Sequence, residues 1–202
     1  RADGLDQLAT TIPPDPGDGG TCVGSALYAC ALEGATAPER MRYGTYLGPA
    51  YDVSEDVAMI DHVDPDHVRR YLKRGVEHAA GTKWRHRTFD DTEGLVADVA
   101  ERLMAAKIVG WYQGRAELGP RALGNRSIVI RPDDRQLAVR LSRHVKDRAL
   151  FRPYALSIRA ESAANVLDLH GMSPTQYRWM QLAADVREDV RERVAGGLHI
   201  DG

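Results

Sequence analysis

The stretch KIVGWYQGRAELGPRALGNRSIVI, residues 107–130, decides how the sequence folds. It opens with an apolar run at 107–113, passes through a loop rich in glycine and arginine, and closes with a second apolar run at 126–130. Short runs rich in β-branched and aromatic residues, bounded by Gly and Pro, are typical of β-strands. The stretch therefore predicts two strands joined by a cationic loop.

The flanking sequence alternates helical and extended patterns. Apolar residues recur at helical spacing in residues 91–106 and 134–145, and a further short apolar run follows at 154–158. The predicted helices are 65–80, 91–106 and 134–145, and the predicted outer strands are 84–89 and 154–158. Strands that alternate with helices predict an α/β domain.

The N-terminal part has a different composition. The segment IPPDPGDGG (12–20) predicts a tight loop, after which Thr21 caps an apolar helix that ends at Gly34. Cys22 and Cys30 lie eight residues apart on this helix, too far to form a disulfide, and are expected to be small buried thiols in a reducing compartment. Residues 35–64 have no sustained period and predict a connector.

Charge is distributed unevenly along the chain. The 202 residues carry a net charge of −2, which gives no general signal for nucleic acid or an anionic membrane. Residues 111–159, however, hold 11 lysines and arginines against 4 aspartates and glutamates, so the remainder is acidic. A cationic segment within an anionic protein favours capture of a small anion. No apolar run approaches the roughly 18 residues of a membrane span, and no leader is visible, so a cytoplasmic protein is expected.

The loop does not match the common nucleotide-binding patterns. Gly114 and Gly119 have the four-residue gap of a P-loop, but Pro120 follows instead of lysine. Gly119 and Gly124 have the same gap, but Asn125 follows. A dinucleotide-type glycine fingerprint is also missing, which argues against a standard NTPase or Rossmann domain.

The residue types still indicate phosphate or carboxylate binding. Arginine meets such anions with a planar fork of donors, and glycines allow backbone amides to approach closely. The candidate residues are Arg115, Arg121, Asn125, Arg126, Ser127, Lys146, Arg148, Arg152 and Ser157. The alternative, that several of these arginines simply pair with surface carboxylates, stays open.

Four further residues are weaker candidates. Glu117 is expected to orient Arg115 or Arg121 by an ion pair, with a Mg²⁺ contact as the alternative. His144 is a solvent-facing helix residue or a proton shuttle. His62 and His67 stand among carboxylates, where the start of a helix explains them better than a metal site.

Two long motifs carry a family resemblance. GWYQGRAELGPRALGNRSIVIRP and VKDRALFRPYALSI together resemble the C-terminal domain of the NodU/CmcH-type O-carbamoyltransferases, which act in nodulation and antibiotic biosynthesis. PPDPGDGGTCVGSAL resembles the last nucleotide-site segment of the family's N-terminal domain, and TYLGPAYD its connector. The chain starts at Arg1 without methionine and stops at HIDG, where the family's closing motif begins, so we expect a piece of a longer polypeptide.

The resemblance implies a fold and a division of the chain. It implies an α/β, YrdC-like domain with a twisted mixed sheet and flanking helices, preceded by a fragment of an ASKHA-type (sugar-kinase and heat-shock ATPase) domain. Residues 1–40 would be the remnant of the N-terminal domain, 41–64 the connector, and 65–202 the YrdC-like domain, incomplete at its end.

The resemblance also implies an ATP-dependent O-carbamoyl transfer. The C-terminal domain would use carbamoyl phosphate and ATP with Mg²⁺ to make carbamoyl-adenylate, and the N-terminal domain would pass the carbamoyl group to a hydroxyl of a natural product with the help of Fe²⁺. The expected roles divide as follows: Arg115 and Arg121 at the carbamoyl phosphate, Lys146, Arg148 and Arg152 at the ATP phosphates, and Asn125, Arg126, Ser127 and Ser157 as further substrate contacts. Asp18 matches the family's metal-ligand aspartate, but its histidine partners would lie upstream, so this chain alone is not expected to hold iron.

Two rival functions remain. A YrdC-related nucleic-acid module is possible because such domains belong to a tRNA-modification pathway, but aromatics are only 6% and do not interleave with the arginines. The second rival function is that of a non-catalytic domain that docks on a partner.

Overall fold

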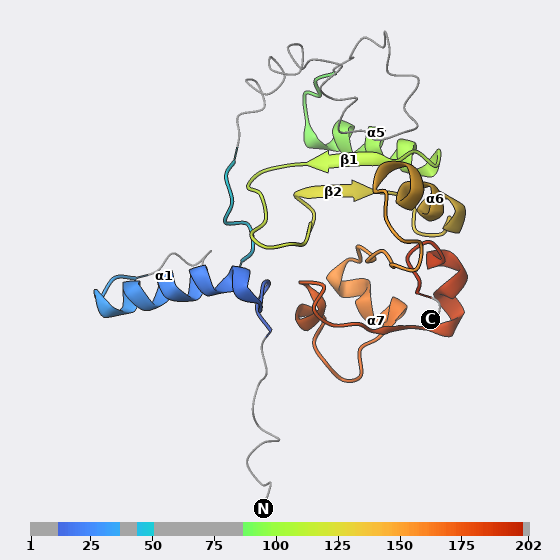
Figure 1. Cartoon of the computed structure of the whole chain (residues 1–202). Coiled ribbons are helices and arrows are strands. Elements are labelled where there is room, and N and C mark those ends of the chain that lie inside the picture. The colour runs from blue at the N-terminus through green and yellow to red at the C-terminus, as the bar shows by residue number, and fades with distance from the viewer. Residues whose placement is uncertain (1–11, 37–43, 51–86, 200–202) are drawn as a thin grey trace, which may run out of the picture.

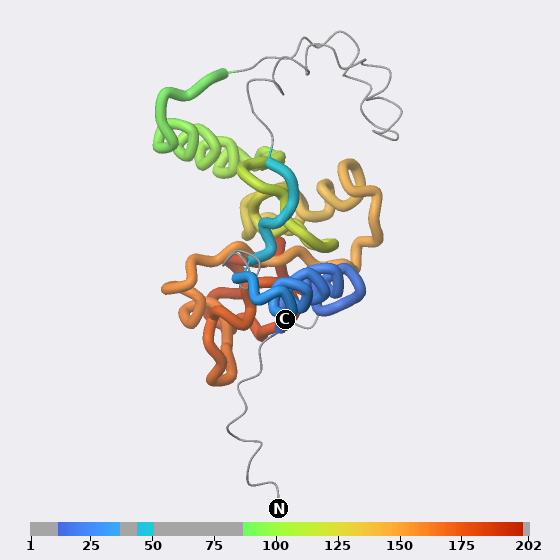
Figure 2. The backbone as a smooth tube through the Cα atoms, turned by 90° about the vertical axis from the view of Figure 1, so that its left-hand side faces the viewer, coloured from blue at the N-terminus to red at the C-terminus, as the bar shows by residue number. Residues whose placement is uncertain are grey.

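The computed structural model describes residues 12–36, 44–50 and 87–199. Its centre is a β-hairpin with α5 (Thr92–Met104) alongside β1 and α6 (Arg135–Arg140) at its far end (Figure 1). The segments from α7 (Ala163–Val166) onward form a second layer below this hairpin, as both Figure 1 and Figure 2 show.

The hairpin is formed by the two strands that the sequence predicts. β1 (Val109–Tyr112) pairs antiparallel with β2 (Arg126–Val129), with Val109 opposite Val129 and Tyr112 opposite Arg126. Both strands are shorter than the apolar runs at 107–113 and 126–130. Because Tyr112 lies opposite Arg126, residues 113–125 form the loop that connects the two strands at one end of the hairpin.

The two helices nearest the hairpin begin at aspartate caps. The Asp91 carboxylate accepts a hydrogen bond from the Gly94 amide (2.6 Å) at the start of α5, which confirms the helix predicted at 91–106. Asp134 likewise accepts from the Leu137 amide (2.8 Å) at the start of α6. The helix predicted at 134–145 forms in two parts, because α6 continues as a five-residue π-helical turn, η2 (Leu141–Val145).

Several of the most buried residues that the structure describes lie on this α6–η2 segment. Leu137 and Leu141 are 1% and 0% exposed, and Ala138 and Ser142 are buried beside them. The apolar spacing that predicts the helix therefore also marks the local core. The segment ends in a turn at Lys146, whose amide donates to the Leu141 carbonyl (3.0 Å).

The strand predicted at 154–158 is wrong. These residues run extended but pair with no strand in the described part of the chain. Gly197 occupies the adjacent space, since a Cβ atom built on it would lie 2.5 Å from the Leu156 side chain. The apolar side chain of Leu156 is thus covered by the C-terminal turn and not by a sheet.

The second layer holds short elements. β3 (Leu167–Asp168) pairs antiparallel with β4 (Asp185–Val186), and the remaining elements are α7 and short 3₁₀ helices. The 3₁₀ helices are η3 (Ala160–Ser162), η4 (Pro174–Tyr177) and η5 (Glu188–Val194). The described residues thus form a mixed α/β structure with two small antiparallel sheets.

The N-terminal helix is also confirmed. η1 (Asp18–Gly20) leads into α1 (Thr21–Leu32), after which Gly34 takes a left-handed φ of +66°. Thr21 does not cap the helix: Gly20 stands at the cap position, and the Thr21 hydroxyl donates to the Asp18 carbonyl (2.6 Å).

The expected burial of the two cysteines is wrong. Cys22 is exposed and Cys30 is half-buried, because no residue of α1 is buried. Both thiols are free.

Several predictions lie outside the described residues, namely the helix at 65–80, most of the connector and most of the strand at 84–89, although 87–89 form no strand. The division into residues 1–40, 41–64 and 65–202 stays a prediction. None of the helices in the described segments is long and apolar enough to cross a membrane.

Candidate anion-binding site

The loop between β1 and β2 is organised around the buried carboxylate of Glu117. Its side chain has no exposed surface, and its Oε1 accepts from the amides of Leu123 (2.6 Å), Asn125 (2.9 Å) and Arg126 (3.3 Å). Its Oε2 accepts from Nε of Arg126 at 2.8 Å, and Nη2 of Arg126 returns to the Glu117 carbonyl at 2.6 Å. One carboxylate thereby joins the outgoing and returning limbs of the loop.

The ionisation of Glu117 follows from these contacts. Burial by itself would raise its pKa, but the ion pair with Arg126 and the amide hydrogen bonds of Leu123 and Asn125 lower the pKa to about 2. Glu117 is therefore charged at any physiological pH. The expectation that it orients Arg115 or Arg121 is wrong, because its partner is Arg126.

Two of the predicted polar contacts close the neck of the same loop. Nδ2 of Asn125 donates to the Arg115 carbonyl at 2.7 Å, while its Oδ1 accepts from Nε2 of Gln113 at 3.2 Å. The Ser127 hydroxyl accepts from the Gly124 amide at 3.0 Å. Asn125, Arg126 and Ser127 thus hold the loop in shape, and their contact with substrate stays a prediction.

Arg115 and Arg121 are left on the surface of the loop. Both are exposed, and Arg115 makes one long contact, from Nη2 to the Leu47 carbonyl at 3.5 Å. Arg121 has no hydrogen bond or ion pair within the described residues. The loop therefore presents two guanidinium groups whose charge no described carboxylate balances.

A second cationic group follows η2. Arg148 stacks over the Tyr154 ring, with its guanidinium carbon 4.1 Å from the ring centre, and its Nη2 donates to the carbonyls of Arg152 and Pro153, each at 3.2 Å. Its Nε is buried and has no hydrogen-bond partner among the described residues. The Tyr154 hydroxyl in turn hydrogen-bonds the hydroxyl of buried Ser142 at 2.8 Å. Tyr154 was not anticipated from the sequence, and only its place two residues after Arg152 could have suggested it.

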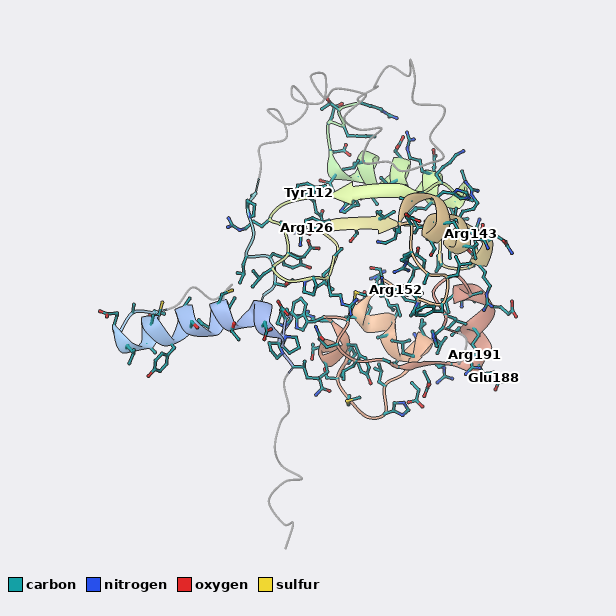
Figure 3. The ribbon with its side chains drawn as sticks, viewed as in Figure 1. Tyr112, Arg126, Arg143, Arg152, Glu188 and Arg191 are labelled. Carbon is teal, nitrogen blue, oxygen red and sulfur yellow. The ribbon has the colours of Figure 1, made fainter. Side chains whose placement is uncertain are left out.

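Lys146 belongs to this group by charge. Desolvation of its ammonium, and then the nearby charges of Arg148 and Arg152, lower the pKa of Lys146, although the residue as a whole is exposed. No carboxylate in the described segments offsets the effect of these two charges on Lys146. In Figure 3 Arg126 lies at the start of β2 and Arg152 below the hairpin, toward α7. No described contact joins the loop arginines to the Lys146 group.

A family model matches the C-terminal half of the chain, and relatives match most of its length. Residues 100–202 match the family model described as the carbamoyltransferase C-terminus. The chain belongs to this family. Every candidate from Arg115 to Ser157 lies inside the matched range, and the family resemblance expected from the motifs is confirmed.

Relatives of this carbamoyltransferase-family chain are longer proteins. A protein of Synechocystis sp. is 34% identical over 185 residues, which cover 89% of this chain and 26% of that protein. Nodulation protein NolNO of Sinorhizobium fredii is 30% identical over 191 residues, 95% of this chain and 25% of the relative. The 3′-hydroxymethylcephem-O-carbamoyltransferase of Amycolatopsis lactamdurans is 28% identical over 191 residues, 95% and 30% of the two chains. The chain spans about a quarter to a third of the length of these relatives.

The remaining candidates of the carbamoyltransferase-family chain stand apart from both groups. Ser157 is exposed on the extended stretch, and Asp18 is exposed at the start of η1. Across the described residues, no three His, Cys, Asp or Glu side chains lie together as a metal site would require. The described residues do not fit an iron centre, and no step below depends on one. His144 is exposed on η2, as the solvent-facing interpretation expects, while His62 and His67 lie outside the described residues.

Proposed function

We propose that this chain is the donor-activating part of an O-carbamoyltransferase, with a YrdC-like site that binds carbamoyl phosphate and Mg²⁺-ATP and forms carbamoyl-adenylate. The polypeptide that completes its relatives would then pass the carbamoyl group to a hydroxyl of a natural product. The observation that carries the proposal is the set of unbalanced cations. Glu117 forms its ion pair with Arg126, so Arg115 and Arg121 have no described carboxylate partner. The second group, Lys146, Arg148 and Arg152, also lacks a described carboxylate partner.

The proposed chemistry needs positive charge more than it needs a nucleophile. Water releases carbamate from carbamoyl phosphate, and inorganic phosphate leaves. A carbamate oxygen then attacks the α-phosphorus of ATP, a new P–O bond forms, and the bond to pyrophosphate breaks. Both steps gather anionic oxygens in one place, where fixed guanidinium and ammonium groups stabilise the transition state.

The two cationic groups are assigned different anions. Arg115 and Arg121, exposed on the loop, would bind the carbamoyl phosphate, and Lys146, Arg148 and Arg152 would bind the ATP phosphates. The buried, unpartnered Nε of Arg148 supports this assignment, because a buried donor without a partner is costly and is relieved by an acceptor. Desolvation and then the charges of Arg148 and Arg152 lower the pKa of Lys146, and a bound anion would offset those charges. Ser157 is a further proposed contact.

Pyrophosphate release tests the proposal. The chain is incubated with Mg²⁺-ATP with and without carbamoyl phosphate, beside Arg121→Ala and Lys146→Ala. Arg140→Ala is the matched control, since Arg140 is exposed on α6 and makes no ion pair within the described residues. Release that requires carbamoyl phosphate, persists in the control and is lost in both site variants would support the proposal.

Two other outcomes are informative. Binding of ATP at millimolar concentration or below, measured by calorimetry, without release would place the nucleotide site here and assign turnover to the longer protein. Neither binding nor release would refute the proposal. A steep loss of nucleic-acid affinity with salt would instead favour a nucleic-acid module.

A further inference from the structure

A segment some 70 residues upstream of the loop lies against its outer side. Residues 44–50, GTYLGPA, run beside the loop in both Figure 1 and Figure 2. Thr45 is 1% exposed and makes a reciprocal pair with Leu118: the Leu118 amide donates to the Thr45 carbonyl at 2.6 Å, and the Thr45 hydroxyl donates to the Leu118 carbonyl at 2.9 Å. Both backbone polar groups of Leu118 are thereby fixed by one residue.

The backbone contact continues along the segment. The Gly48 amide donates to the Ala116 carbonyl, and the Ala116 amide donates to the Pro49 carbonyl, each at 2.9 Å. A Cβ atom on Gly48 would lie 2.9 Å from both the Cβ and the carbonyl oxygen of Ala116. Only glycine allows the two backbones to come this close.

Tyr46 reaches the other limb of the loop. Its hydroxyl donates to the Leu123 carbonyl at 2.9 Å, while the Leu123 amide donates to Glu117 from the opposite side. Leu118 and Leu123 are therefore both held at their N–H and C=O groups. Between these two fixed points lies the four-residue arc 119–122, which carries Arg121.

We propose that residues 45–49 are a positioning segment of the anion site, in which Thr45 and Tyr46 fix the ends of the arc and so set where Arg121 meets its anion. The inference rests on the proposed function for the identity of that anion, carbamoyl phosphate. It extends the site beyond the family match, which begins at residue 100. The predicted connector is thus a structural part of the site as well as a link between domains.

The mildest test is Tyr46→Phe, which deletes one hydroxyl and keeps the ring. Its matched control is Tyr28→Phe, because Tyr28 is 67% exposed on α1 and far from the loop in sequence. Calorimetry on each variant measures affinity for carbamoyl phosphate and, separately, for Mg²⁺-ATP. We expect Tyr46→Phe to bind carbamoyl phosphate roughly threefold to tenfold more weakly, as for loss of one hydrogen bond, with ATP affinity unchanged.

The selectivity of the loss separates positioning from simple stability. If Tyr46 had a purely structural role, Tyr46→Phe would lower the urea midpoint. The folded variant would then bind carbamoyl phosphate and Mg²⁺-ATP with wild-type affinity. Carbamoyl phosphate affinity within twofold of wild type in Tyr46→Phe would overturn the inference, as would an equal loss in Tyr28→Phe.

Hydrogen exchange keeps the inference testable if the chain binds neither ligand. In that case the proposed function fails, and the contact is judged by exchange of the Ala116 and Leu118 amides. Gly48→Ala should speed exchange at both, because the new Cβ cannot fit against Ala116. Unchanged exchange in Gly48→Ala would show that the segment does not hold the loop.

Discussion

Replacing Glu117 with glutamine should destabilise the fold by removing the one buried negative charge of the loop. Glutamine has nearly the same volume but only one acceptor oxygen. If that oxygen serves the amides of Leu123 and Asn125, its NH₂ group faces Nε of Arg126, donor against donor. The substitution therefore breaks the ion pair and leaves part of Arg126 without a partner.

The magnitude follows from the pKa of Glu117. A carboxyl whose pKa falls from 4.5 to about 2 on folding contributes on the order of 3 kcal/mol at neutral pH. Loss of one partner from a buried ion pair costs about 3–5 kcal/mol, and the 40% exposure of the Arg126 side chain reduces that figure. Both routes give about 3 kcal/mol.

Urea unfolding of Glu117→Gln against wild type measures this difference. Because the folded pKa is depressed, the contribution is complete above pH 4.5 and is lost as pH falls from 4.5 toward 2. The difference should be constant from pH 6 to 8 and fall to about half or less by pH 3. The matched control is Glu161→Gln, in the exposed ion pair with Arg159, which should change stability by less than about 0.5 kcal/mol. A Glu117→Gln difference below about 1 kcal/mol at pH 7, or one that does not change down to pH 3, would refute the reasoning.

Three other substitutions probe separate parts of the fold. Leu141→Ala empties a fully buried position of η2 and should cost about 2–5 kcal/mol in urea unfolding. Gly119→Ala forces a side chain onto a φ of +97° and should lower stability by about 1–2 kcal/mol, seen as a lower Tm. Tyr154→Phe loses the hydrogen bond to Ser142, at a cost of about 1 kcal/mol, but keeps the ring under Arg148, so ATP affinity should change less than in Tyr154→Leu.

Local structure was predictable where the pattern is local. The apolar runs around 107–113 and 126–130 and the helical spacing of 91–106 each identify one element. The strand predicted at 154–158 shows the limit. Its Leu156 side chain lies against Gly197, some 40 residues away, and no property of the short run itself distinguishes that cover from a sheet.

The pairing of Glu117 shows the same limit within the site. Arg115 and Arg121 are nearer to it in sequence than Arg126 is, so sequence distance favours the wrong partner. The positive φ values of Gly119 and Gly124 turn the chain back, and the β1–β2 register then sets Arg126 beside the carboxylate. The residue types of the loop were visible from the sequence, whereas the division between arginines that shape the loop and arginines left free depends on its three-dimensional path.

That division carries the functional argument. An arginine that shapes a loop needs its carboxylate nearby, and Glu117 is the sole acidic residue between β1 and β2. With that charge committed to Arg126, no described carboxylate is paired with Arg115 or Arg121, and in the second group the charges of Arg148 and Arg152 act on Lys146. An anion that binds either group in the folded chain, and not in the unfolded chain, stabilises the fold. Carbamoyl phosphate at about 100 times its Kd should then stabilise the folded chain by about 2.7 kcal/mol. Arg121→Ala should lose most of that increment while losing little stability of its own, because Arg121 is exposed and makes no hydrogen bond or ion pair within the described residues.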